Sequence, residues 1–145
     1  MAVVVDASAV GAIAFGEPEG PALAAHLEGE TLLAPTLLDY ELVNLALKKA
    51  RRYPMALSKI ALSLRAALAL PVSRVAVPGF DVFALAAETG LTADDASYLW
   101  VARSRDAELV TLDAALARAA SRDSRVTAGG AREGVPDGNP DRPTD

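Results

Sequence analysis

Apolar and polar positions along the chain predict strands that alternate with helices. Short runs rich in β-branched or apolar residues are typical of buried strands, and they occur at residues 2–6, 31–35, 72–77 and 107–112, with a last short strand near residue 126. Apolar residues three and four positions apart predict helices at 8–14, 21–28, 36–52, 55–70, 80–90, 91–105 and 113–120. This order predicts an α/β fold whose mainly parallel sheet is covered by helices on both faces, with the strand at 72–77 at an edge.

Length and composition indicate one globular domain followed by a tail. The chain has 145 residues, of which 52% are hydrophobic, so it can bury a core of its own. The segment 129–145 differs, because it contains four glycines and three prolines and almost no apolar residue. We therefore expect a domain at 1–128 and a disordered tail at 129–145.

Several kinds of chemistry are excluded by the residues that the sequence lacks. There is no cysteine and only one histidine, His26, so thiolate sites and multi-histidine zinc sites are excluded and a Ser-His-Asp triad is disfavoured. No apolar run is long enough to cross a bilayer, and the start MAVVVDASAV has no basic region before an apolar stretch, so no signal peptide is expected. We therefore expect a soluble, cytoplasmic protein without membrane contact. The net charge of −5 argues weakly against nucleic-acid binding by bulk charge, although Lys48–Arg52 is a compact basic cluster.

Four carboxylates are expected at one edge of the sheet. Asp6 and Asp113 end two predicted strands, Asp95 lies in the first turn of a helix, and Glu41 lies in the second turn of another. Ligands of open α/β sheets bind outside the carboxyl ends of the strands, where the following helices begin.

Each aspartate also has a purely structural interpretation. Asp6 and Asp113 can cap the helices that follow them, and Thr92 with Asp95 resembles a capping box. Glu41 is harder to explain in this way, because Leu37, Leu38, Leu42, Val43 and Leu45 surround it on an apolar helix. A carboxylate in such surroundings is costly unless it is paired or binds a metal.

Converging carboxylates without histidine or cysteine favour Mg²⁺ or Mn²⁺ over zinc. These ions lower the pKa of a bound water and stabilise negative charge at phosphorus. The set therefore suggests hydrolysis of a phosphodiester.

Four segments resemble the motifs of PIN-domain ribonucleases, most closely those of the VapC-type toxins of bacterial toxin–antitoxin pairs. The segments are VVVDASA with Asp6 and Ser8, APTLLDYELVNLALKK with Glu41 and Asn44, LTADDASYLWVA with Asp95, and ELVTLDAALARAA with Thr111 and Asp113. The resemblance covers residues 2 to about 127 and implies a three-layer α/β/α fold with four to five strands and about seven helices. Position 94 is often aromatic or apolar in relatives, so Asp94 is an additional acid here.

The resemblance implies a Mg²⁺- or Mn²⁺-dependent endoribonuclease that acts as a toxin, forms a homodimer and binds a VapB-like antitoxin. Asp6, Glu41, Asp95 and Asp113 would be the metal-binding and catalytic residues, supported by the side chains of Ser8, Asn44, Asp94 and Thr111. Tyr98 and Trp100 could stack on bases, but their spacing favours the core. The alternatives are a housekeeping RNA-processing nuclease and a PIN-like module that binds RNA or protein without catalysis. An aspartate-nucleophile phosphatase is disfavoured, because Ser8 stands where that mechanism needs a second aspartate.

Overall fold

The computed structural model describes residues 1–123 and 125–129, which form a five-stranded sheet with helices on both faces. The strands are β1 (Ala2–Val5), β2 (Thr31–Pro35), β3 (Val72–Val75), β4 (Glu108–Val110) and β5 (Thr127–Gly129). The helices are α1 (Ala7–Ala14), α2 (Gly20–Leu27), α3 (Leu38–Arg52), α4 (Leu57–Ala69), α5 (Gly79–Thr89), α6 (Ala93–Arg105) and α7 (Ala114–Arg122), with a short 3₁₀ turn, η1 (Pro54–Ala56), between α3 and α4.

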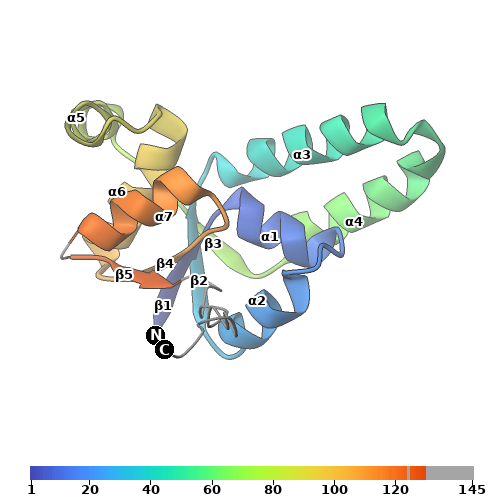
Figure 1. Ribbon diagram of the computed structural model, residues 1–145, viewed down its shortest axis with the longest axis horizontal. Coiled ribbons are helices and arrows are strands. Elements are labelled where there is room, and N and C mark those ends of the chain that lie inside the picture. The colour runs from blue at the N-terminus through green and yellow to red at the C-terminus, as the bar shows by residue number, and fades with distance from the viewer. Residues whose placement is uncertain (124, 130–145) are drawn as a thin grey trace, which may run out of the picture.

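The sheet is parallel throughout and separates two helical layers. Its strand order is β3-β2-β1-β4-β5, so β1 is central and β3 lies at an edge, as predicted. Helices α1 to α4 lie on one side of the sheet and α5 to α7 on the other (Figure 1). The predicted three-layer α/β/α fold is confirmed. Val3, Val4 and Val5 are fully buried, because β1 is covered on both faces.

Two strands are shorter than their apolar runs predict, because each ends together with the strand that it pairs with. The strand expected at 72–77 stops at Val75, which pairs with Pro35, the last residue of β2. The strand expected at 107–112 stops at Val110, which pairs with Val5 before the chain turns into α1. Strand β5 includes Gly129, which we expected in the tail, and the rest of that tail lies outside the described residues.

Helix α3 begins later than its sequence pattern predicts. The backbone N–H of Thr36 donates a 3.2 Å hydrogen bond to the carbonyl of Val75 and so extends the contact of β2 with β3. The helix therefore starts at Leu38, and Glu41 lies in its first turn rather than its second. The later start of α3 places Glu41 closer to the edge of the sheet than the sequence predicts.

Helices α3 and α4 pack against each other as an αα-hairpin, which projects from the body of the domain (Figure 1). None of the helices in the described part of the chain is both long and apolar enough to span a membrane.

Candidate functional site

Asp6 is the buried centre of the candidate site. It follows the central strand β1, caps the N-terminus of α1 and is only 5% exposed. Its Oδ1 accepts hydrogen bonds from the hydroxyl of Ser8 at 2.7 Å and from the backbone N–H of Ala9 at 3.0 Å. Its Oδ2 accepts a hydrogen bond from the hydroxyl of Thr111. The capping role anticipated for Asp6 is thus real, and it holds the carboxylate in one orientation.

The hydroxyls of Ser8 and Thr111 join the start of α1 to the turn between β4 and α7. Besides donating to Asp6, the Ser8 hydroxyl accepts a 2.9 Å hydrogen bond from the backbone N–H of Leu112. The Thr111 hydroxyl accepts one of 2.9 Å from the N–H of Asp113. Because each hydroxyl both donates and accepts, the two turns are held in register, and the position of Asp113 depends on that of Asp6.

Asp113 and Asp95 each lie where a helix begins. Asp113 caps α7 by accepting a 2.8 Å hydrogen bond from the N–H of Leu116, and its side chain is exposed. Asp95 is half-buried in the first turn of α6, which Thr92 caps by accepting a 3.2 Å hydrogen bond from the Asp95 N–H. Burial and the negative charges of Asp113 and Asp6 raise the pKa of Asp95, while the bond to Thr92 opposes this.

Glu41 reaches the same group from the opposite helical layer. Its Oε1 accepts a 2.7 Å hydrogen bond from the hydroxyl of Tyr98 on α6. Burial raises the pKa of Glu41 to about 6 against the effect of this bond, and the negative charges of Asp94, Asp6 and Asp95 contribute to the rise. The sequence marks the burial of Glu41 as costly unless the carboxylate is paired. Its partner is the neutral hydroxyl of Tyr98, and no ion pair of Glu41 occurs within the described residues.

The sequence favours a place in the core for Tyr98, and the hydrogen bond of its hydroxyl was not predicted. The side chain is 1% exposed, as expected for a core residue, but its hydroxyl donates a hydrogen bond to Glu41. A buried tyrosine hydroxyl needs a partner, and so does a glutamate on an apolar helix. The sequence therefore signals that each side chain needs a partner, although it does not show that the two pair with each other. Trp100 packs against the core, as expected.

The four predicted carboxylates lie near enough for their charges to act on one another, and two of the predicted supporting residues, Asp94 and Asn44, lie at the surface. Burial raises the pKa of Asp6, and the charge of Asp113 adds to this rise despite the opposing hydrogen bonds. Asp94 is exposed and acts on Glu41 and Asp95 only through its charge. Asn44 is also exposed, one turn beyond Glu41.

The carboxylates fit a hard divalent cation by donor type and charge. All are oxygen donors of one sign, and burial together with mutual repulsion raises the pKa values of Asp6, Glu41 and Asp95, an effect that a bound cation would relieve. Within the described ranges, however, no three histidine, aspartate or glutamate side chains lie close enough together to hold a metal ion.

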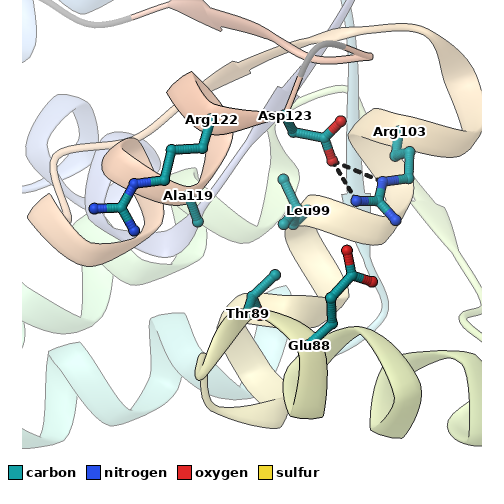
Figure 2. A pocket seen from close by; sticks show the side chains of 7 residues that line it. All are labelled: Glu88, Thr89, Leu99, Arg103, Ala119, Arg122 and Asp123. Atoms are coloured by element: carbon teal, nitrogen blue, oxygen red, sulfur yellow. Dashed lines mark hydrogen bonds and ion pairs between the residues drawn. The ribbon is translucent and has the colours of Figure 1, made fainter.

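A cavity of about 230 Å³ lies away from this edge, among α5, α6 and α7. It is lined by Glu88, Thr89, Leu99, Arg103, Ala119, Arg122 and Asp123. Figure 2 shows the Arg103 guanidinium turned to Asp123, which it contacts at 2.6 and 2.7 Å, while Arg122 points away from this pair. None of the four carboxylates lines the cavity. The ion pair of Arg103 with Asp123 joins α6 to the end of α7.

Comparison with known proteins identifies the family. Residues 3–122 match the PIN domain, and the chain belongs to this family. PIN domains have a nuclease-type fold and are generally metal-dependent nucleases that act on RNA. The resemblance seen in the sequence is thus confirmed at the level of the PIN domain.

A solved structure supports the same assignment. The crystal structure of PAE2754 from Pyrobaculum aerophilum matches with a TM-score of 0.65 and 34% sequence identity, covering 82% of this chain and 87% of that one. No curated protein matches the chain.

Proposed function

We propose that the protein is a Mg²⁺- or Mn²⁺-dependent endoribonuclease that hydrolyses RNA phosphodiester bonds. The observation that carries the proposal is the group formed by Asp6, Glu41, Asp95 and Asp113, whose charges act on one another at the carboxyl edge of the sheet. Mg²⁺ or Mn²⁺ bound there would supply a water of lowered pKa and stabilise negative charge at phosphorus.

The roles of the individual residues follow from their surroundings. Asp6, fixed by three hydrogen bonds, is the most rigid of the metal ligands, and Asp95 and Asp113 provide further carboxylate oxygens from α6 and α7. Glu41 is held by Tyr98 on the opposite side. Ser8 and Thr111 orient the ligands, and Asp94 and Asn44 border the group at the surface.

The biological role that we propose is that of a toxin, regulated by a VapB-like antitoxin and acting as a homodimer. The support for this role is the resemblance of the four motifs to VapC-type toxins. The α3–α4 hairpin also exposes several large apolar side chains that a protein partner could cover, namely Leu47, Tyr53, Met55, Leu57 and Leu62.

RNA cleavage by the purified protein tests the proposed activity. The protein is incubated with RNA in Mg²⁺ or Mn²⁺ and in EDTA, beside the Asp95→Asn variant. Metal-dependent cleavage that the variant lacks is expected. As a matched control, Asp106→Asn makes the same change at the far end of α6, where the left-handed backbone (φ 50°) suits asparagine. Cleavage by Asp95→Asn would reject the assignment of the site. No cleavage by any of the proteins would favour the non-catalytic module.

A further inference from the structure

A row of polar residues runs along one side of α3, from the candidate site toward the tip of the α3–α4 hairpin. Glu41, Asn44, Lys48 and Arg51 follow one another at intervals of three, four and three residues, which places them on one side of the helix. Glu41 contacts Tyr98 across the site, so this side of α3 starts at the carboxylates. Lys48 and Arg51 lie about 10 and 15 Å farther along the helix axis.

The basic cluster at 48–52 divides into paired and unpaired cations. Lys49 forms a salt bridge with Glu17 and lies 5.4 Å from the centre of the Phe15 ring. Arg52 lies 5.5 Å from the centre of the ring of the adjacent Tyr53. Lys48 and Arg51, by contrast, are exposed, and neither takes part in an ion pair within the described part of the chain. These two charges are therefore available to a partner.

Tyr40 adds an aromatic surface beside this row. It immediately precedes Glu41, lies one turn before Asn44, and is 77% exposed. Lys48 lies about 12 Å farther along the same side of the helix. An exposed aromatic ring in line with cations is a combination that binds single-stranded nucleic acid, since bases stack on the ring while cations hold phosphates.

We propose that Tyr40, Asn44, Lys48 and Arg51 form a track for the substrate, here called the α3 track, along which single-stranded RNA leaves the carboxylate site. A base stacks on Tyr40, and Lys48 and Arg51 each contact a phosphate. The inference rests on the proposed ribonuclease function.

The distribution of charge on the protein favours RNA as the occupant of the α3 track. The protein has a net charge of −5 and its site is acidic, so a polyanion gains affinity only from local cations. The track also requires an unpaired strand, because a base within a duplex cannot stack on a side chain.

RNA binding measured against salt concentration tests the track without relying on cleavage. A fluorescent oligouridine is titrated with the full-length Asp95→Asn protein in Mg²⁺, with and without Lys48→Ala and Arg51→Ala. Each lost phosphate contact lowers the slope of log K against log salt by about 0.7, so the double variant is expected to lose about 1.4. The control pair Arg65→Ala and Arg105→Ala removes two exposed cations from α4 and the far end of α6 and is expected to leave the slope unchanged.

Tyr40 is tested in the same assay. Tyr40→Ala is expected to weaken binding about tenfold at every salt concentration, whereas Tyr40→Phe keeps the ring and the affinity. Equal effects of the two substitutions would contradict stacking.

The outcomes separate the track from the nuclease proposal. If the wild-type protein cuts RNA while the Lys48/Arg51 variant keeps its full slope, the track is wrong and the nuclease stands. If nothing is cut but the slope falls as expected, the track stands and the nuclease is wrong. Polyglutamate that displaces RNA from the parent protein at equal charge concentration would assign this face to an acidic protein partner and overturn the proposal.

Discussion

The hydroxyl of Tyr98 donates a 2.7 Å hydrogen bond to Oε1 of Glu41, across 57 positions of sequence and between the two helical layers. Tyr98 is buried on α6 and Glu41 is half-buried on α3. The pair therefore links the two helical layers at the candidate site.

Tyr98→Phe is expected to cost about 1–2 kcal/mol in the free energy of unfolding, because it removes the donor from a partly buried carboxylate. It also raises the pKa of Glu41 above its present value of about 6, since this hydrogen bond lowers that pKa. Denaturant unfolding at pH 8 and NMR titration of the glutamate measure both effects. The exposed Tyr53→Phe serves as control and should change neither.

Thr111→Val removes a hydroxyl that donates to Asp6 and accepts from the Asp113 N–H. The variant is expected to lose about 1–3 kcal/mol of stability, because the buried Asp6 carboxylate and the partly buried N–H of Asp113 lose their partner. Its affinity for Mn²⁺ should also fall, since Asp6 and Asp113 are no longer held in register. Thr111→Ser keeps the hydroxyl and should restore the metal affinity. A role in packing alone would predict the opposite, with Val tolerated better than Ser.

The stability of the metal-free protein is expected to fall as the pH rises. Glu41, Asp6 and Asp95 all have a raised pKa, so the folded chain binds protons more tightly than the unfolded chain. Stability is then lost while these groups ionise, which for Glu41 occurs between its ordinary pKa of 4.5 and about 6.

Glu41→Gln isolates this effect. In EDTA at pH 8 it should stabilise the protein by on the order of 1 kcal/mol, allowing for the partial exposure of Glu41 to solvent. The variant should also lose cleavage activity. Thermal unfolding from pH 4 to 8 makes the measurement, and a wild-type profile that rises over this range would contradict the raised pKa values that burial and repulsion give these carboxyls.

The helices, the strands and the carboxylates at the edge of the sheet were predictable because they depend on the local sequence. The β-branched run Val3–Val5 indicates a buried strand wherever it occurs, and Asp6 and Asp113 precede helices that need caps. The end of a strand depends on its partner, which is why β3 stops at Val75 and α3 starts at Leu38. The bond between Tyr98 and Glu41 depends on the packing of two layers, so the sequence could suggest only that each side chain needs a partner.

Binding of Mn²⁺ tests the central claim most directly. Calorimetric titration of the wild-type protein near pH 6, in two buffers of different ionisation enthalpy, should show binding with release of protons, because carboxyls with raised pKa must ionise to bind the metal. Asp95→Asn should bind at least tenfold more weakly, whereas Asp106→Asn should match the wild type. Equal Mn²⁺ affinity in all three proteins, without proton release, would show that these carboxylates are not a metal site.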